Sequence, residues 1–563
     1  MTNISCTLFA VPGASPGPLF LARRALGWLA LLLVVGMLAR PAAAAESTSF
    51  EQALGHLATA NFKQKERAVG ELLDARHANT RAVLNALLEG TLYYRKDDRR
   101  VFIAAAQDAS LRLLDPLTMS DAGTAEASDY TKITTNNQLR KTLKSALASF
   151  DLADPDANVR LAAVNELMRS LDADSVSILR ARQSSEKNDA VRTAISTGLA
   201  IADLDSADAA VRLAAVEQLE GSLNPEAFNR LSALVTKADD GSYAEPDENV
   251  RNAARAALNE IDNWRSFYRT LETLFFGLSL GSVLVLAAIG LAITFGVMGV
   301  INMAHGELMM LGAYTTYVIQ LLMPQHIGAS VLVAIPVAFL VAGGVGVLIE
   351  RGIMRFLYGR PLETLLATFG VSLVLQQIVR DIFTANNRPV ETPAWMAGSL
   401  QINEAFSITY NRLYVVLFML IVFAILQLVL KKTSLGLKVR AVAQNRAMAK
   451  SMGVRTEWVD ALTFGLGSGI AGVAGVALSQ LTNVGPNLGQ SYIIDSFMVV
   501  VFGGVGNLWG TLIGGMSLGV VNQALEPYAG AVLAKILVLI ALILFIQRRP
   551  RGLFPQKGRA AEN

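Results

Sequence analysis

The segment TSLGLKVRAVAQNRAMAKSMGV, residues 433–454, separates two strongly apolar stretches of the chain. Lys and Arg are dense within it and directly beside it: Lys431, Lys432, Lys438, Arg440, Arg446, Lys450 and Arg455. Short loops that are rich in Lys and Arg lie on the cytoplasmic side of a membrane. We therefore predict that residues 433–454 form a cytoplasmic loop between two membrane-spanning helices.

The pattern inside this loop favours a short helix that docks in a groove of another protein. Its larger apolar residues recur at spacings that place them on or near one helical stripe: Val439, Val442, Met448 and Met452. Small residues between them keep the predicted helix slim: Ala441, Ala447, Ala449 and Gly453. A solvated loop that only fixes the topology is the alternative.

The composition indicates a chain with a soluble half and a membrane half. The chain is 52% hydrophobic and 17% charged, with a mean hydropathy of +0.41, which is too apolar for an ordinary soluble protein. Residues 46–265 hold 26 Lys and Arg against 34 Asp and Glu, whereas the rest holds 23 against 12. The basic residues cluster beside apolar runs, so nucleic-acid binding gains no support.

Residues 1–45 have the pattern of a secretory signal peptide. Arg23 and Arg24 precede an apolar core at 25–38, and the alanines at 42–45 offer a cleavage site. Removal of this segment predicts that residues 46–265 are exported; an uncleaved first helix is the alternative. Cys6 lies ahead of the apolar core and is the single cysteine, so disulfides are excluded for the mature chain.

The predicted exported domain, residues 46–265, is mostly helical with an internal repeat. VRLAAV occurs at 159–164 and 211–216, with related text at 189–194 and 249–254. An Asp stands three residues before the Val of three of these units and is predicted to cap a helix: Asp156, Asp208 and Asp247. We predict HEAT-like helical repeats, with an irregular bundle as the alternative. Residues 90–104 are the exception, because two β-prone runs there predict a hairpin.

The predicted transmembrane domain covers residues 266–555 and is followed by a cytoplasmic tail, 556–563. Apolar runs lie at 272–297, 303–323, 329–349, 362–385, 412–430, 457–481, 491–525 and 530–547. An exported N-terminus and a basic C-terminal end require 491–525 to cross the membrane an even number of times. We therefore predict a re-entrant hairpin or two short spans, broken near residues 503–507. The predicted fold class of the whole chain is all-α.

Polar residues inside the apolar runs are candidates for a substrate pathway, because such groups usually face the interior of a helical bundle. The first three follow one another closely in the chain: Asn302, His305 and Glu307. Gln376 and Gln377 lie within a later run, and Asn507 lies at the predicted break. Polar contacts between helices, without a role in transport, are the alternative reading of each.

Several common kinds of site find no support. Gly467, Gly469 and Gly472 spell G-x-G-x-x-G within an apolar run, where close helix packing is favoured over a dinucleotide site. No G-x-x-x-x-G-K-[ST] motif occurs, so the chain carries no Walker-type ATP site. The four histidines lack metal-ligand spacing, and no nucleophile–base set is evident. We predict no enzyme activity, metal or cofactor.

Four segments resemble the branched-chain amino acid and urea permease family of ABC importers. They are residues 296–314 (GVMGVINMAHGELMMLGAY), 356–383, 433–454 and 499–515, in the order of the family. Within 433–454 the resemblance rests on Gly436, Arg440, Ala441, Asn445, Ala449, Gly453 and Val454. It implies that this loop couples an ATPase to the membrane domain.

The text of residues 356–383 and the exported domain are similar to the urea branch of that family. The resemblance implies a permease subunit of a bacterial inner-membrane importer for urea or a close short amide, with its N-terminal domain in the periplasm. Its implied partners are a second permease subunit, two cytoplasmic ATP-binding subunits, a periplasmic solute-binding protein and membrane lipid. The alternatives are a branched-chain amino acid permease and a membrane receptor whose exported domain senses a ligand.

Overall fold

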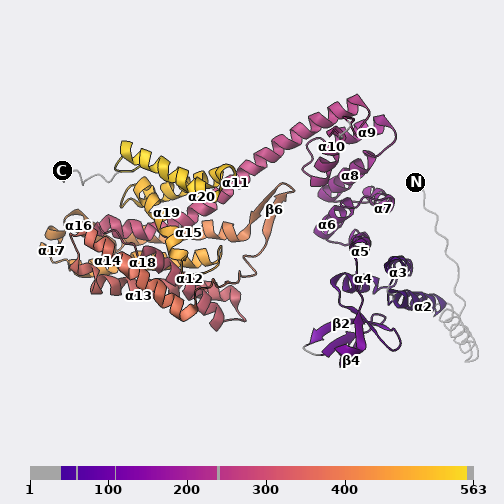
Figure 1. The fold of residues 1–563 in the computed structure, drawn as a ribbon, viewed down its shortest axis with the longest axis horizontal. Coiled ribbons are helices and arrows are strands. Elements are labelled where there is room, and N and C mark those ends of the chain that lie inside the picture. Colours follow the sequence, from indigo (N-terminus) through magenta and orange to yellow (C-terminus); the bar gives the residue numbers. More distant parts are fainter. Residues whose placement is uncertain (1–39, 59–60, 108–109, 238–240, 555–563) are drawn as a thin grey trace, which may run out of the picture. The chain divides into compact units, whose positions relative to one another are not determined.

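The computed structural model describes residues 40–58, 61–107, 110–237 and 241–554, with the backbone alone for residues 40–48 (Figure 1). The chain divides into an N-terminal unit, Met1–Asn259, and a C-terminal unit, Glu260–Asn563. Most of the predicted signal peptide and the whole of the predicted tail lie outside the described residues. Residues 40–45, which include the predicted cleavage site, form the start of helix α2 (Arg40–Leu57).

The N-terminal unit opens with helices and then forms a sheet. After α2 come α3 (Phe62–Asp74) and α4 (Thr80–Glu89). Five antiparallel strands follow in the spatial order β4-β3-β2-β1-β5: β1 (Leu92–Arg95), β2 (Val101–Gln107), β3 (Ser110–Leu114), β4 (Asp121–Glu126) and β5 (Tyr130–Lys132). The predicted hairpin is confirmed, because Tyr93 pairs with Phe102 and Tyr94 with Val101.

The prediction of an all-α fold is therefore wrong for this part of the chain, although the chain as a whole is mostly helical. The strands that were not predicted are β3, β4 and β5. β5 is three residues long, and β4 has the sequence DAGTAE, which carries no apolar alternation. The pairing with β3, whose Leu111 and Leu113 are buried, holds β4 in place. Tertiary pairing overrides a weak local preference here.

Helices from the repeat region follow one another in the rest of the N-terminal unit (Figure 1). They are α5 (Asn137–Asp151), α6 (Ala157–Met168), α7 (Ala173–Gln183), α8 (Asp189–Asp203), α9 (Ala209–Gln218), α10 (Pro225–Val235) and the start of α11 (Glu248–Met298). The three predicted caps are confirmed: the side chains of Asp156, Asp208 and Asp247 accept backbone N–H bonds at the starts of α6, α9 and α11. The HEAT-like classification stays a prediction.

Each VRLAAV unit contains an Arg that connects two loops: the loop that precedes its own helix, and a later loop that precedes α8 or α11. Arg160 donates to the carbonyls of Asp154 and Pro155 and to both oxygens of Glu186, at 2.8 to 2.9 Å. Arg212 donates to both oxygens of Glu245 at 2.8 Å and to two carbonyls ahead of its own helix. All four side chains are 11% exposed or less. The hydrogen bonds from Arg160 lower the pKa of Glu186 to about 2.

The C-terminal unit is a helical bundle with one two-stranded hairpin, β6 (Ser399–Asn403) and β7 (Phe406–Thr409). Its further elements are α12 (His305–Leu322), α13 (Ile327–Gly352), η2 (Met354–Phe356), α14 (Pro361–Phe383), α15 (Tyr410–Lys432), α16 (Ser434–Gln444), α17 (Arg446–Ser451), α18 (Thr456–Ser479), α19 (Leu488–Gly503) and α20 (Leu508–Arg548). Within the described residues, six helices are long and apolar enough to cross a membrane: α11, α13 with η2, α14, α15, α18 and α20.

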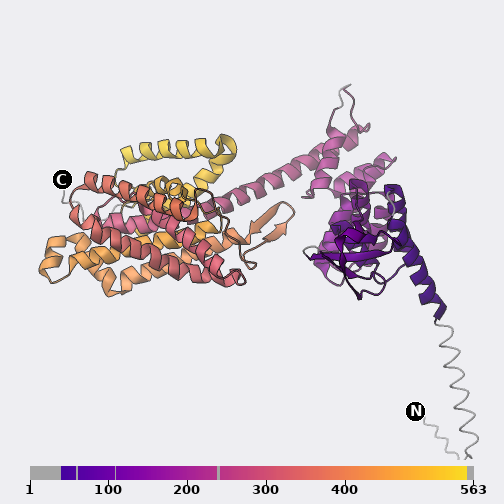
Figure 2. The same ribbon diagram turned by 60° about the horizontal axis from the view of Figure 1, so that its bottom comes forward.

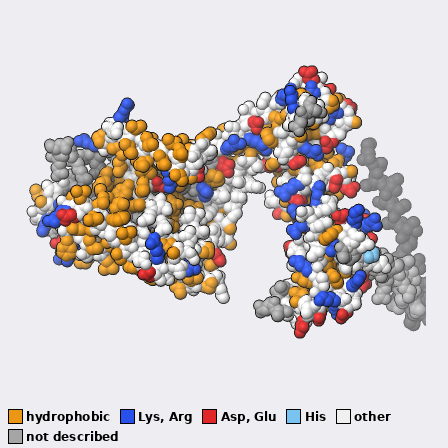
Figure 3. Space-filling model, viewed as in Figure 1, with side chains coloured by type: hydrophobic (Ala, Val, Ile, Leu, Met, Phe, Trp, Pro, Cys, Tyr) orange, Lys and Arg blue, Asp and Glu red, His pale blue; other side chains and the backbone are white. Residues whose placement is uncertain are grey.

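The exposure of these helices separates a core from a lipid-compatible surface. The most apolar stretches of α11 and α18 are more than four-fifths buried, whereas those of α14, α15 and α20 are mostly exposed. Figure 3 shows apolar side chains covering the face of this unit, while Lys, Arg, Asp and Glu are spread over the N-terminal unit. The pattern matches a bundle of membrane helices around a buried centre.

Glycines set the spacing of the central helices. A Cβ atom at Gly472 of α18 would lie 2.5 Å from the carbonyl oxygen of Ala338 in α13, and one at Gly467 would lie 2.7 Å from the carbonyl oxygen of Gly290 in α11. The G-x-G-x-x-G text therefore serves close helix packing, as predicted.

The predicted break in the last apolar region is confirmed. α19 ends at Gly503 and α20 begins at Leu508, and between them Gly504 and Gly506 adopt positive φ angles of 102° and 75°. A further break lies within α20 at Gly530, where the backbone leaves the helical conformation (Figure 2, yellow).

Candidate functional site

A cluster of buried polar residues surrounds the connection between α11 and α12. α11 ends at Met298 and α12 begins at His305, so residues 299–304 interrupt the helical path inside the bundle. Asn302 and His305 are fully buried, and Glu307 is 1% exposed. Interrupted helices with buried polar residues often line substrate sites in transporters.

Two of these residues hold the connection in place. The Asn302 side-chain oxygen accepts from the backbone N–H of Ala304 at 3.0 Å. The Nε2 atom of His305 lies 2.8 Å from the carbonyl oxygen of Ala287 in α11. These contacts fit the alternative reading in which Asn302 and His305 are structural.

Glu307 joins α12 to α14. Its Oε1 atom accepts from the Ser372 hydroxyl at 3.0 Å and from the Gln376 amide at 2.7 Å. Its Oε2 atom is buried and has no hydrogen-bond partner among the described residues. A buried carboxylate oxygen without a partner is uncommon, so this atom marks a functional candidate.

The contacts continue from Gln376 to the start of α19. The Arg380 guanidinium lies 3.5 Å from the Gln376 side-chain oxygen and donates to the Asn487 side-chain oxygen at 2.9 Å. We call Glu307, Ser372, Gln376, Arg380 and Asn487 the polar chain. Ser372, Arg380 and Asn487 were not predicted. For the first two the available signal was their spacing, because Ser372 and Arg380 lie four residues on either side of Gln376 and share its helical face.

Two of the predicted pathway residues lie elsewhere. Gln377 is exposed, because neighbouring residues of a helix lie on different faces and Gln376 takes the buried one. The Gln377 amide donates to Asp381 at 2.8 Å. Asn507 caps α20 by accepting from the N–H groups of Trp509 and Gly510, and it donates to the Phe554 carbonyl at 3.3 Å. No hydrogen bond joins Gln377 or Asn507 to Glu307 within the described residues, and a shared pathway for the predicted set stays a prediction.

Residues 433–454 form two short helices, so the prediction of one helix with one apolar stripe is wrong. Asn445 ends α16 and accepts from the N–H of Met448, which makes it the cap of α17. The chain turns at this residue. Val439, Val442 and Ala449 are consequently buried together, whereas Met448 and Met452 are 60% and 78% exposed.

The remaining predicted residues of the loop shape its turns. Gly436 packs so closely on the backbone of Leu430 that a Cβ atom would not fit, and Arg440 donates to the Leu430 carbonyl. Gly453 has a positive φ of 84° and ends the segment beyond α17. Ala441 is half-buried.

A second charged cluster links α17 to the bundle. Arg446 forms an ion pair with Asp460 of α18, which is fully buried, and its guanidinium lies 4.6 Å from the centre of the Tyr358 ring. The Tyr358 hydroxyl donates to Glu350 of α13 at 2.9 Å. Arg446 was predicted only as one of the basic residues of the loop, and its partners were not predicted. A carboxylate inside the apolar run 457–481 was the signal for Asp460.

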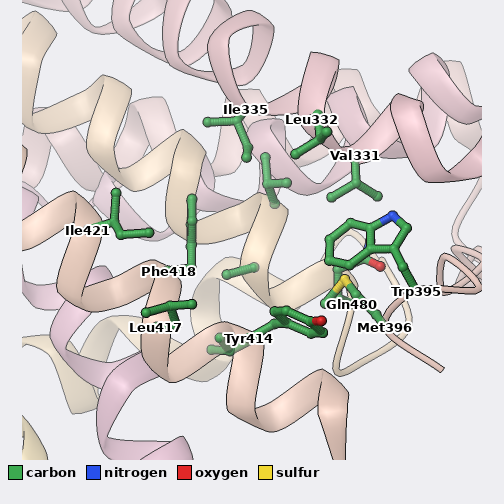
Figure 4. Close-up of a pocket in the computed structure, with 13 residues that line it drawn as sticks. Val331, Leu332, Ile335, Trp395, Met396, Tyr414, Leu417, Phe418, Ile421 and Gln480 are labelled. Atoms are coloured by element: carbon green, nitrogen blue, oxygen red, sulfur yellow. The ribbon is translucent and has the colours of Figure 1, made fainter. Parts of the chain in front are cut away.

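The C-terminal unit also holds an apolar pocket of about 170 Å³ between α13, α15, α18 and the loop before β6 (Figure 4). Its lining includes Leu332 and Ile335 of α13, Trp395 of the loop, and Tyr414 and Phe418 of α15. No group of three or more His, Cys, Asp or Glu side chains suited to a metal ion occurs within the described ranges.

Comparison with known proteins places the similarity in the C-terminal unit. The family model for the branched-chain amino acid transport system permease component matches residues 273–546. The high-affinity branched-chain amino acid transport system permease protein LivH of Salmonella typhimurium is 33% identical over 300 residues, which cover 51% of this chain and 96% of LivH.

Two relatives of lower identity match a similar share of this chain. The corresponding permease protein BraD of Pseudomonas aeruginosa is 29% identical over 296 residues, covering 51% of this chain and 96% of BraD. The ribose import permease protein RbsC of Haemophilus influenzae is 25% identical over 278 residues, covering 47% of this chain and 81% of RbsC.

Proposed function

The chain belongs to the family of branched-chain amino acid transport permease components, and from this premise we propose that it moves a branched-chain amino acid through the inner membrane as one subunit of an ABC importer. The observation that carries this proposal is the similarity to LivH over nearly all of LivH's length. The sequence analysis favoured urea, but the relatives support its alternative, branched-chain amino acids.

Energy for transport comes, in this proposal, from separate ATP-binding subunits. The surface proposed to contact them is the exposed side of α16 and α17, where Leu437, Met448 and Met452 are 60% to 78% exposed among Lys and Arg side chains. Exposed apolar side chains on a short helix suit a groove in a partner. Gly436, Arg440, Ala441, Asn445, Ala449 and Gly453 shape this surface.

The N-terminal unit is proposed to lie in the periplasm and to guide a solute-binding protein onto the permease. HEAT-like repeats, which the sequence predicts for this unit, present extended binding faces. A second permease subunit completes the proposed importer. The receptor alternative loses its support, because the family is one of transport components.

Urea remains the second candidate cargo on one observation. The N-terminal unit lies outside the family match at 273–546, and the resemblance to the urea branch implies an extension of this kind on some urea permeases. Branched-chain amino acids are favoured because the relatives that are matched over 96% of their own length carry that name.

Radiolabelled uptake in a deletion strain tests the proposal. Deleting the gene is expected to abolish leucine uptake at low concentration, and a plasmid copy is expected to restore it. Loss of urea uptake with intact leucine uptake would overturn the proposed cargo. Unchanged uptake of both, with no ATP-binding subunit copurifying, would overturn the permease role itself.

A further inference from the structure

We infer that Glu307 and Arg380 recognise the two charged groups of an α-amino acid, the ammonium and the carboxylate respectively. This inference rests on the proposed function and identifies the side chains that bind the charged groups of the substrate. It concerns the polar chain between α12, α14 and the start of α19. Within this chain the Gln376 amide lies between the Glu307 carboxylate and the Arg380 guanidinium.

The Gln376 side chain has the same polarity as an amino-acid zwitterion. Its NH₂ group donates to Glu307 at 2.7 Å, and its oxygen faces the Arg380 guanidinium at 3.5 Å. An α-amino acid likewise carries a donor group, the ammonium, beside an acceptor group, the carboxylate. A substrate can therefore take over both interactions of the amide in the same orientation.

Glu307 and Arg380 could each form a stronger contact than the one that they form with Gln376 or its surroundings. The Oε2 atom of Glu307 is buried without a partner, and burying a carboxylate oxygen in this way is unfavourable. An ammonium group has three N–H donors and would satisfy it. The 3.5 Å contact between Arg380 and Gln376 is at the limit of a hydrogen bond, so a carboxylate would replace it with a stronger, charge-assisted bond.

The surroundings suit an aliphatic side chain. Met310, Val379 and Leu488 come from the same three elements as the polar chain and belong to one buried apolar cluster. Val379 is next to Arg380 in the chain, and Leu488 is next to Asn487. Asn487 is exposed, so the Arg380 end is the end nearer to solvent. A branched aliphatic substrate would thus find apolar packing beside the charges that hold its backbone.

The competing reading is a structural contact that only ties α14 to α12. Both readings predict that removing Glu307 or Arg380 weakens the protein. They differ in selectivity, because a structural role affects all ligands equally. A recognition role affects only the ligand that carries the matching charge.

The test uses the importer purified with its partner subunits and measures competition against radiolabelled leucine. Leucinamide lacks the carboxylate and 4-methylpentanoate lacks the ammonium. The wild-type importer is expected to prefer leucine over each analogue by roughly 10- to 100-fold, the value of one charged hydrogen bond. Arg380→Met should abolish the preference over leucinamide alone, and Glu307→Gln the preference over 4-methylpentanoate alone.

Matched controls come from the exposed pair at the start of α14, where Arg360 and Glu363 lie 3.1 Å apart. Arg360→Met and Glu363→Gln should keep both preferences. If Arg380→Met and Glu307→Gln also keep both, or lose both together, the inference is overturned while the permease role stands. A wild-type importer that carries urea and no amino acid would instead overturn the proposed cargo and the inference with it.

Discussion

Arg446 of α17 forms an ion pair with Asp460 of α18, a carboxylate with no exposed surface, and thereby fixes the loop to the membrane bundle. The same guanidinium covers the ring of Tyr358, whose hydroxyl donates to the buried Glu350 of α13. One side chain of the proposed ATPase-contacting segment is therefore linked to two helices of the bundle, directly to α18 and through Tyr358 to α13.

Arg446→Ala is expected to lower stability and to separate ATP hydrolysis from transport. It leaves a buried acceptor without its partner, which costs about 1–3 kcal/mol. Thermal unfolding of the purified importer measures the first effect, and the number of leucine molecules carried per ATP measures the second. Lys450→Ala, an exposed cation of the same helix, should change neither. Addition of Asp460→Asn should recover part of the lost stability, and failure to do so would show that the two residues are not coupled.

The Arg160–Glu186 pair is expected to make the N-terminal unit sensitive to acid. Its hydrogen bonds lower the pKa of Glu186 to about 2 in the folded state, so the stabilisation is complete above the ordinary carboxyl pKa and is lost as the pH falls through about 2. Glu186→Gln leaves Arg160 without its anionic partner and should cost about 3–5 kcal/mol at pH 7.

Hydrogen exchange of α6 and α8, compared between pH 7 and pH 3 in the full chain, measures this effect. The wild type should lose protection at pH 3, and Glu186→Gln should show a flatter pH dependence. The exposed Asp189→Asn supplies the matched carboxyl control. An unchanged pH dependence in Glu186→Gln would contradict the assignment to this pair.

Local signals explain most of what could be predicted from the sequence. The Asp caps, the hairpin of β1 and β2, and the break at Gly504 and Gly506 each depend on residues within a few positions of one another. The polar chain joins helices that are distant in sequence, so the spacing on α14 marks Ser372, Gln376 and Arg380 on one face but does not reveal their partner on α12. Arg446 and Asp460 are only 14 residues apart, but their pairing depends on the turn between α17 and α18, which no periodicity reveals. The bend at Asn445 was also missed, because the apolar spacing was read as a single helix across a residue that caps the next one.

Gly472→Val is expected to destabilise the bundle, because α18 must move away from α13. The added Cβ would lie 2.5 Å from the Ala338 carbonyl oxygen, and overpacking of this kind typically costs about 1–3 kcal/mol. Gly344→Ala, in α13, meets nothing within 4 Å and should be neutral or slightly stabilising. Unfolding of the detergent-solubilised protein measures both. Equal effects of the two substitutions would show that the spacing of α13 and α18 does not depend on Gly472.

Met448→Glu with Met452→Glu is expected to release the ATP-binding subunits while the permease stays folded. Both side chains are mostly exposed, so the folded permease loses little packing, but the apolar surface proposed for the partner's groove disappears. Loss of central apolar contacts weakens association by at least roughly tenfold. Copurification of the ATP-binding subunits measures the effect. Ser451→Glu adds charge to the same helix without removing an apolar side chain, so it should retain them. Undiminished copurification of the double variant would mean that the ATP-binding subunits contact another surface.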